Sequence, residues 1–324
     1  MKFKFVLLII VIFFSANSYS SEKLTIRLGV LAFGTVNWEL SALKNLKLLE
    51  NADFLLKIIP VANPQAGKIA LQAGAVDIIV SDWIWVSRLR STGSDFTFYP
   101  YSNTSGALIV PKSSSIKLLK DLQGKKLGIA GGELDKNWLL LQALAQQQDQ
   151  INLNESVEKI YGAPPLLNQQ IIRGRVDAVI NYWHYAAKLE AQDYQQIING
   201  KEILEKLGIK QEVPILGYVF NRRWAQQHKN QLNKFLKATQ EAKNQLCQSN
   251  AAWSEVIPLT RVNDLATQTK LRQRYCDGRI KHWGAEEQQA AQKIYHLLKK
   301  LSQQKLTGNS DKLQPGTFWA IDEI

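Results

Sequence analysis

The stretch Gly74-Ala-Val-Asp-Ile-Ile-Val-Ser-Asp-Trp83 decides the fold, because it recurs one hundred residues later as Gly174-Arg-Val-Asp-Ala-Val-Ile-Asn-Tyr-Trp183. The glycine, the first valine, the aspartate and the tryptophan stand at the same positions in both copies. Upstream of each copy an Asn-Trp pair also recurs, at residues 37–38 and 137–138. This spacing predicts two similar α/β units in one chain.

Each copy has the pattern of a helix end, a glycine stop, a buried strand and a polar and aromatic rim. A glycine after a helical run adopts the left-handed conformation without a side-chain penalty, and an apolar run such as residues 76–80 suits a strand covered on both faces. The rim residues then lie at the carboxyl ends of parallel strands, where open α/β sheets bind ligands. Trp83 and Trp183 either bind a ligand there or pack between helix and sheet, and their occurrence as a matched pair favours binding.

The N-terminus has the pattern of an export signal. Basic Met1-Lys-Phe-Lys4 precedes an apolar run from Phe5 to Phe14 that is too short to span a bilayer, and small polar residues follow through Ser20. We expect residues 1–20 to be a signal peptide cleaved near Ser20. No cysteine follows the apolar run and no later stretch approaches transmembrane length, so the mature protein is expected to be exported and soluble.

Net charge and cysteine content limit the possible partners of the protein and predict a disulfide. The formal charge of +12 includes two lysines of the signal, and the remaining Lys and Arg residues are spread along the chain. The export signal argues against nucleic acid as a partner. We therefore interpret the Lys and Arg residues as lying on solvent-exposed faces of the protein. The only cysteines, Cys247 and Cys276, are an even pair in an oxidising compartment. They are most simply a disulfide, contributing roughly 3–4 kcal/mol to stability.

Local patterns predict an alternation of strands and helices, which is typical of parallel α/β units. Besides the two repeat copies and a strand beginning at Leu127, strands are expected near residues 24–29, 54–60, 96–101, 106–112, 157–161, 194–198 and 213–220. Helices are expected near residues 40–49, 64–73, 83–90, 113–126, 135–148, 164–173 and 184–191, and then near 224–246, 251–257, 264–275 and 285–301.

Two chain crossings are expected between the units, near residues 102–106 and 211–217, and two crossings make a hinge. The C-terminal helices are expected to cover the first unit. We therefore assign residues 21–104 and 214–324 to a first lobe and residues 105–213 to a second lobe.

Three segments carry a family resemblance: Gly74-Ala-Val-Asp-Ile78, the run from Gly106 to Ile129 with its phrase Leu119-Lys-Asp-Leu-Gln-Gly-Lys-Lys126, and Gly174-Arg-Val-Asp-Ala178. With these segments the chain resembles the periplasmic substrate-binding proteins of ABC importers. The group concerned is NMT1/THI5-like and serves nitrate, taurine, aliphatic sulfonates and thiamine-pyrimidine precursors. The likeness extends from about residue 24 to residue 220 and weakens in the C-terminal helices.

The resemblance implies an α/β fold of the type II periplasmic-binding-protein class. Two lobes, each a mostly parallel sheet flanked by helices, are joined by a two-strand hinge. The cleft closes on a small molecule, as a population shift powered by ligand contacts to both lobes, and the closed form docks on a membrane permease. No bond is made or broken, so we expect a periplasmic monomer that uses no cofactor or metal and has no enzymatic activity.

The candidate ligand site collects the strand-end residues of both units. They combine aromatic, amide, hydroxyl and carboxylate groups with one loop glycine: Phe33, Thr35, Asn37, Trp38, Asn63, Ser81, Asp82, Trp83, Gly132, Glu133, Asp135, Asn137, Trp138, Asn181, Tyr182 and Trp183.

These turns differ from those of the nitrate and sulfonate binders, which present helix N-termini with hydroxyl or basic groups to an anion. Here the turns carry Asp82, Glu133 and Asp135, with Lys136 as their one base. The carboxylates are helix caps or ligand groups, and even as caps they place negative charge where an anion would lie. We therefore expect an aromatic or amine-bearing ligand, held by cation–π contacts (~1–2 kcal/mol) and charge-assisted hydrogen bonds (~1.5–3 kcal/mol each).

The sequence also bears on classes other than a solute-binding protein, namely enzymes and transcription regulators. The four histidines, His184, His228, His282 and His296, stand singly and without metal-ligand spacing. The cysteine-rich segment of pyrimidine-synthesising enzymes that this family resembles is missing. The effector domain of a transcription regulator would need a helix-turn-helix in place of the export signal. Two alternatives stay open: an exported ligand-sensing or accessory protein without a permease, and a binder of a sulfonate- or nitrate-like anion.

Overall fold

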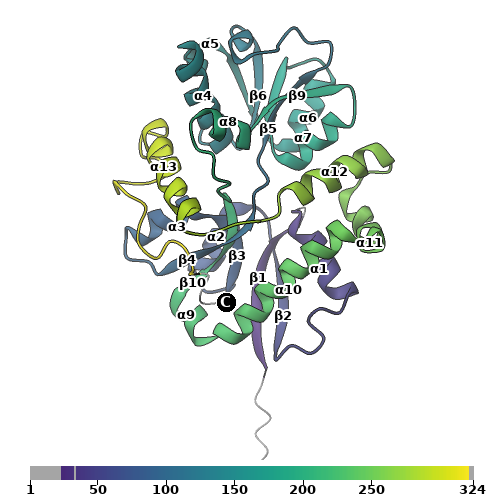
Figure 1. Ribbon diagram of the computed structural model, residues 1–324, viewed down its shortest axis with the longest axis vertical. Helices are drawn as coiled ribbons and strands as arrows, with labels where there is room; N and C mark the ends of the chain where they lie inside the picture. Colours follow the sequence, from purple (N-terminus) through teal and green to yellow (C-terminus); the bar gives the residue numbers. More distant parts are fainter. Residues whose placement is uncertain (1–22, 33, 321–324) are drawn as a thin grey trace, which may run out of the picture.

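Two five-stranded sheets organise the protein, and the computed structural model describes them within residues 23–32 and 34–320. Each sheet forms the centre of one lobe, and the lobes stand one above the other (Figure 1). The predicted signal peptide and Phe33 lie outside the described residues. Within the described part of the chain, every helix is too short or too polar to cross a bilayer.

The sheet of the first lobe has the order β2-β1-β3-β10-β4. Its strands are β1 (Leu24–Leu31), β2 (Phe54–Val61), β3 (Ile78–Asp82), β4 (Phe96–Ser102) and β10 (Leu216–Asn221). β1 pairs in parallel with β2 and β3, whereas β10 runs antiparallel between β3 and β4. The strand that returns from the second lobe is therefore inserted into the first sheet.

The sheet of the second lobe has the corresponding order β7-β6-β8-β5-β9. Its strands are β5 (Ala107–Pro111), β6 (Lys126–Ala130), β7 (Glu158–Gly162), β8 (Ala178–Asn181) and β9 (Tyr194–Asn199). Here β5, which follows the first crossing, is the antiparallel strand, inserted between β8 and β9. Each lobe is thus mostly parallel, with one antiparallel strand supplied at a crossing, and the predicted fold class is confirmed.

The repeated Gly-x-Val-Asp segment explains this correspondence. Gly74 and Gly174 have φ values of 70° and 65°, as a left-handed helix stop requires. The two aspartates share a role that the sequence analysis missed. Asp77 accepts a hydrogen bond from the backbone N–H of Arg27 at 2.7 Å, and Asp177 accepts one from that of Lys126 at 2.7 Å. Each aspartate therefore ties the residue before its own strand, β3 or β8, to the neighbouring parallel strand, at the sheet end opposite the predicted site.

Some helices of the two lobes begin with a side-chain cap and others do not; Asn63, Asp82 and Asp135 each accept a backbone N–H at a helix start. The first lobe has α1 (Val36–Asn45), α2 (Pro64–Gln72) and α3 (Trp83–Arg90). The second has α4 (Lys136–Asp149), α5 (Leu153–Ser156), α6 (Pro164–Ile172), α7 (Trp183–Glu190) and α8 (Gly200–Lys206). The short helices α5 and α8 were not expected.

Two expected helices differ from the prediction. Within residues 113–126 the chain forms only the 3₁₀ turn η1 (Leu119–Leu122). The Asp121 carboxylate accepts from the backbone N–H groups of Lys117 and Leu118, and such local bonds compete with helix formation. The long helix expected at 224–246 is interrupted at His228, which separates α9 (Arg222–Gln227) from α10 (Lys229–Gln248).

The C-terminal helices contact both lobes. α10 and α11 (Asn250–Thr260) pack on α1, whereas α12 (Leu265–Asp277) packs on α7 and α13 (Ala285–Leu301) packs on α4. In Figure 1, α12 and α13 lie on opposite flanks of the region where the lobes meet. The chain then returns to the first sheet beside β4, where the Phe98 N–H donates to the carbonyl of Thr317 and the Trp319 N–H donates to the carbonyl of Phe98. The C-terminal third of the chain therefore covers the first lobe, as expected, and also contacts the second.

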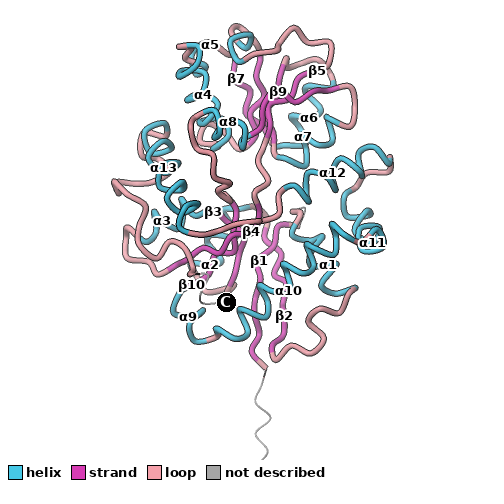
Figure 2. Tube along the Cα trace, in the orientation of Figure 1, coloured by secondary structure: helices cyan, strands magenta, loops and turns pink. Residues whose placement is uncertain are grey.

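One apolar cluster runs through both lobes. It includes Ile79 and Trp83 of the first lobe together with Leu108 and Trp138 of the second. The two predicted crossings run as loops between the sheets (Figure 2). The lobes therefore share an apolar core at their junction.

Candidate functional site

The predicted site residues lie where strands of each sheet end and helices begin. β3 leads directly into α3, so Asp82 is the last strand residue and Trp83 the first helical one. β8 leads into α7 in the same way, through Tyr182 to Trp183. The structure brings several of the predicted residues together at the junction of the lobes, as the contacts Trp38–Trp183 and Asp82–Lys136 show.

Trp38 and Trp183 meet across the junction. Their ring centroids lie 5.9 Å apart with planes at 85°, the edge-to-face geometry that aromatic pairs prefer. Trp38 lies in the first turn of α1 in the first lobe, and Trp183 starts α7 in the second. Trp253 and Tyr275 of the C-terminal helices also contact Trp38, at centroid distances of 5.6 and 5.5 Å. One flank of the junction is therefore an aromatic contact between the two lobes.

Asp82 lies on the other flank and also joins the lobes. Its Oδ1 accepts from the backbone N–H of Trp85 and caps α3, while its Oδ2 lies 3.4 Å from Lys68 Nζ and 3.5 Å from Lys136 Nζ. Burial by itself raises the pKa of Asp82, but the charges of Lys136 and Lys68 outweigh burial and lower it to about 2. Lys68 belongs to α2 of the first lobe, whereas Lys136 begins α4 of the second.

Asp135 and Tyr182 form a polar group on the second lobe. Asp135 caps α4 by accepting from the backbone N–H groups of Asn137 and Trp138, at 2.9 and 3.1 Å. Burial raises the pKa of Asp135, and these hydrogen bonds only partly offset it. Burial and the Asp135 charge raise the pKa of Tyr182 to about 12. Glu133 stands apart from them, paired with Lys305 at 2.9 Å on the surface.

Three predicted residues have internal partners that hold the fold. Trp83 is fully buried, and its Nε1 donates to the carbonyl of Pro214 in the second crossing at 3.0 Å. Trp138 is 1% exposed within the shared core. Asn181 donates to Pro164 O and Asn168 Oδ1 and accepts from the N–H of Tyr182, so its amide is already satisfied.

The other predicted residues shape the loops around the junction. Asn37 donates to the carbonyls of Leu31 and Gly34, and Asn63 is an exposed cap of α2. Asn137 lies so close to Gly106 and Gly200 that a side chain at either glycine would collide with it. Thr35 is half-buried ahead of α1, Ser81 is buried in β3, and Gly132 has a φ of 84° before α4.

A cavity of about 90 Å³ adjoins Trp183 at the hinge. The first crossing, α7, the end of β9 and the end of α12 enclose it, and its lining includes Asn103, Trp183, Glu190, Lys201 and Arg274. Glu190 and Arg274 pair there at 2.6 Å. At roughly 10–15 Å³ of accessible volume per water, this cavity has room for several water molecules.

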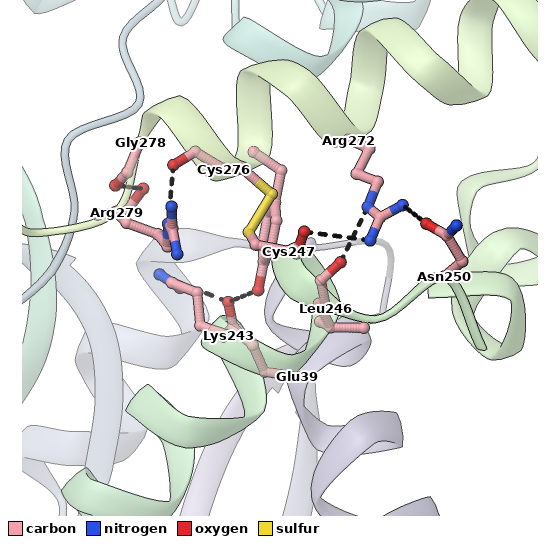
Figure 3. Close-up of a disulfide and its surroundings, with 11 residues drawn as sticks. Glu39, Lys243, Leu246, Cys247, Asn250, Arg272, Cys276, Gly278 and Arg279 are labelled. Carbon is pink, nitrogen blue, oxygen red and sulfur yellow. Dashed lines mark hydrogen bonds and ion pairs between the residues drawn. A yellow bond between two sulfur atoms is a disulfide. The ribbon is translucent and has the colours of Figure 1, made fainter. Parts of the chain in front are cut away.

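A buried ion pair that no sequence pattern predicted lies next to Trp38 in the chain. Glu39, 1% exposed, lies 3.5 Å from Lys243 Nζ and accepts from the Tyr275 hydroxyl at 2.5 Å. Lys243 also donates to the carbonyl of Tyr101 at 2.6 Å and stands 3.7 Å from that ring. Burial raises the pKa of Glu39, while Lys243 opposes the shift. Figure 3 shows that this pair lies beside the disulfide.

Cys247 of α10 and Cys276 of α12 are disulfide-bonded, as the sequence predicted, with Cα atoms 5.6 Å apart (Figure 3). The bond fixes α12 to the helix that covers the first lobe. α12 in turn holds the second lobe, because Arg274 donates to both Glu190 oxygens and to Gln196 Oε1. This covalent link therefore bears on the hinge as well as on the C-terminal helices.

The pattern of residues at the strand ends does not predict which lysines pair with the carboxylates of the site. Lys136 was visible there as an isolated base, but nothing in the sequence places it beside Asp82. Lys68 and Lys243 lie inside helices, where lysine is usually a solvated residue. Among the described residues, no three His, Cys, Asp or Glu side chains gather as a metal site.

The two sheets and the two crossings between them give this chain the two-lobed fold of the periplasmic-binding-protein class. The model of the family described as NMT1/THI5 like matches residues 49–250, more than half of the chain. The chain therefore belongs to the NMT1/THI5-like family, as its sequence motifs indicated, and this family assignment places it among substrate-binding proteins rather than enzymes. A comparison with curated protein sequences finds no significant match.

Solved structures share this fold at low sequence identity. The periplasmic aliphatic sulphonate binding protein from Escherichia coli is 18% identical, with a TM-score of 0.69 and coverage of 91% of this chain and 99% of that one. The alkanesulfonate-binding protein from Xanthomonas axonopodis pv. citri, bound to MOPS, is 16% identical, with a TM-score of 0.65 and coverage of 91% and 98%. An ABC transporter protein from Parabacteroides distasonis is 14% identical, with a TM-score of 0.68 and coverage of 92% and 99%.

Proposed function

We propose that the protein is a periplasmic solute-binding protein that captures a small molecule between its lobes and delivers it to an ABC permease. The observation that carries this proposal is the meeting of the two repeat units at one junction, where Trp38 faces Trp183 and Asp82 reaches Lys136. Binding energy gained from both lobes at once is what couples ligand capture to closure. We assign residues 21–104 and 214–324 to one lobe, and residues 105–213 to the other.

We propose a ligand with an amine or an aromatic ring. Trp183 is half-buried and borders the hinge cavity, so its ring is available for stacking once the lobes separate. Asp82 and Asp135 supply carboxylates at the same junction, and an ammonium group can take the place of a lysine at Asp82. Of the sixteen predicted residues, those with side chains suited to contact a guest are Thr35, Trp38, Asp82, Asp135, Tyr182 and Trp183.

A specific observation favours a second candidate, an anionic ligand. Lys68 and Lys136 share the single carboxylate of Asp82, so the three side chains together carry one excess positive charge. An anion between the two lysines would gain charge-assisted hydrogen bonds from both lobes. The sulfonate-binding names of similar structures are consistent with this candidate.

Substitution of Asp82 separates the two ligand classes. Asp82→Asn keeps the cap of α3, because asparagine accepts the Trp85 N–H equally well, but it removes the negative charge. An amine ligand should then lose at least tenfold in affinity, whereas an anion should bind more tightly because both lysines are released. Isothermal titration with small amines, aromatic acids, sulfonates and nitrate measures both effects.

The screen itself is a thermal-shift experiment with the same compounds on the mature protein. A true ligand at one hundred times its dissociation constant adds about 2.7 kcal/mol to the unfolding free energy. Mass analysis of the recovered compound should show it unchanged, as expected for a binder. A protein that opens and closes yet is stabilised by no compound of any class would contradict the proposed transport role and favour an exported accessory protein.

Export and partners are part of the proposal. The basic and apolar N-terminal segment supports a signal peptide cleaved near Ser20 and a periplasmic location, and a permease partner follows from the proposed role. We propose that the protein acts as a monomer. N-terminal sequencing of the secreted protein and its mass in solution test the cleavage and the oligomeric state.

A further inference from the structure

The positive charge of the protein is concentrated in its C-terminal third. Residues 214–324 contain seventeen Lys and Arg against nine Asp and Glu, whereas residues 105–213 contain thirteen against twelve. Lysine and arginine are thus spread along the whole chain, but the acidic residues that balance them are not. An excess of one charge in one region attracts partners of the opposite sign.

The densest part of this excess lies on α13 and on the segment that follows it. Residues 288–320 contain five lysines and one histidine but only one acidic residue, Asp311. Lys293, His296 and Lys300 are exposed and stand three and four positions apart, so they share one face of α13. α13 lies on an outer flank of the molecule (Figure 1). Its exposed face is therefore basic.

A shallow hollow of about 390 Å³ adjoins this face at the end of α13. Its lining is entirely polar or charged and consists of His296, Lys299, Lys300, Gln303, Gln304 and Asp311. Lys299 pairs with Asp311 at 2.5 Å, which neutralises the one carboxylate of the lining. The hollow therefore keeps a positive charge.

Three lysines of this region have no counter-ion. Lys293, Lys300 and Lys312 are exposed, and none of them forms an ion pair with any residue that the structure describes, whereas the two other lysines pair with Asp311 and Glu133. Lysines in the last turn of a helix stabilise its C-terminal carbonyls. This role accounts for Lys300 but not for Lys293, two turns earlier, or for Lys312, beyond the helix. We call Lys293, His296, Lys300 and Lys312 the α13 surface.

The α13 surface suits a layer of anions better than a folded protein. Among the described residues, no largely exposed apolar side chain of the larger kinds lies after Leu265. Protein interfaces are built around a desolvated core of apolar and aromatic side chains, and the α13 surface has no such anchor. Attraction to anionic lipid headgroups needs only exposed charge.

The spacing of the lysines also favours several anions over one. Lys293 and Lys300 are two helical turns apart, which is about 10 Å along the axis, and Lys312 lies in the segment beyond. A single phosphate group is too small to contact all three. Neighbouring headgroups of a lipid surface can pair with each of them.

We propose that the α13 surface is a peripheral membrane-binding surface that takes anionic phospholipid headgroups. The contact keeps the protein beside the membrane that carries the proposed permease, so that capture and delivery of a solute occur close to the same surface. This inference goes beyond solute capture and rests on the proposed function only through the proposed export of the protein.

A triple variant removes the free charge of the α13 surface. Lys293→Gln/Lys300→Gln/Lys312→Gln replaces three unpaired lysines, so no carboxylate loses its partner. Binding of the mature protein to vesicles of phosphatidylcholine and phosphatidylglycerol in equal parts is measured by co-sedimentation, without any solute. The variant should bind about a hundredfold more weakly than the native protein, because each lysine near an anionic surface contributes roughly a factor of five.

A matched control removes the same charge from the second lobe. Lys117→Gln/Lys206→Gln/Lys210→Gln replaces three exposed lysines in the part of the chain where basic and acidic residues balance. This control should bind the mixed vesicles as the native protein does. Vesicles of phosphatidylcholine alone should bind none of the proteins, and 1 M salt should release them all, because it shortens the screening length to about 3 Å. Circular dichroism verifies that each variant is folded.

Four results would overturn the proposal. An equal loss in both triple variants would show that net charge acts without a defined surface, and equal binding to neutral vesicles would show apolar anchoring. Displacement by inorganic phosphate at constant ionic strength would assign the hollow to a single small anion. Tighter binding to polyglutamate than to the mixed vesicles would favour an acidic protein as partner. Because the assay contains no solute, each of these results leaves the outcome of the ligand screen standing.

Discussion

Trp83 and Trp183 occupy the same position of the repeat but have different surroundings. Trp83 is fully buried and hydrogen-bonded to Pro214, whereas Trp183 is half-buried against Trp38. Trp83→Ala should therefore lower the unfolding free energy by about 3–5 kcal/mol, the cost of a large buried cavity. Trp183→Ala should cost less than half as much in the ligand-free protein, as measured by urea unfolding. Equal losses would contradict the distinction between a core and a cleft tryptophan.

His184, the neighbour of Trp183, predicts a dependence of stability on pH. Burial, with a smaller effect of the Lys188 charge, lowers the pKa of His184 to about 3, and its Nδ1 has no hydrogen-bond partner among the described residues. The unfolded chain binds a proton at this residue below a pKa of about 6.5, whereas the folded protein does not. Stability is therefore fully present above pH 6.5 and falls as the pH drops toward 3. The loss at pH 5 should be up to about 2 kcal/mol.

His184→Phe isolates this contribution. Phenylalanine cannot titrate and suits the aromatic neighbours Trp183 and Tyr185. Urea unfolding at pH 7 and pH 5 should show a smaller loss on acidification in the variant than in the native protein. An equal loss of unfolding free energy on acidification in both proteins would show that protonation of His184 does not destabilise the fold.

At the scale of elements, the disulfide should stabilise α12 more than the rest of the fold. Cys247 and Cys276 are separated by 29 residues, and closing a loop of that size in the unfolded chain contributes about 3–4 kcal/mol. The double variant Cys247→Ser/Cys276→Ser should lose this amount in chemical unfolding. Hydrogen exchange should quicken first in α12, because only non-covalent contacts, such as those of Arg272, Arg274 and Tyr275, then hold this helix. Uniformly faster exchange would argue against a local effect.

At the scale of the whole molecule, the lobes should unfold together. The apolar cluster that contains Trp83 continues to Trp138, and α12 and α13 each contact the second lobe. Calorimetry of the ligand-free protein should therefore show a single transition, with equal calorimetric and van't Hoff enthalpies. Two resolved transitions would mean that the shared core contributes little to cooperativity. Lys136→Met, which leaves this core intact, should preserve the single transition.

The sequence determined the architecture because its signals are local. Gly74 and Gly174 require left-handed backbone, Asn63-Pro64 starts a helix, and the repeat sets the same strand order in both lobes. Such conformational preferences act within a few residues, so the repeat alone predicted the two α/β units. The even pair of cysteines likewise predicted the disulfide.

Tertiary structure decided which rim residues face the cleft and which partners they meet. Identical positions of the repeat became a buried Trp83 and a half-buried Trp183 because the C-terminal segment, through Phe318, covers the first but not the second. Lys136 reaches Asp82 only because the two lobes face one another. Burial and charge pairing depend on segments distant in sequence, and only the folded chain brings those segments together.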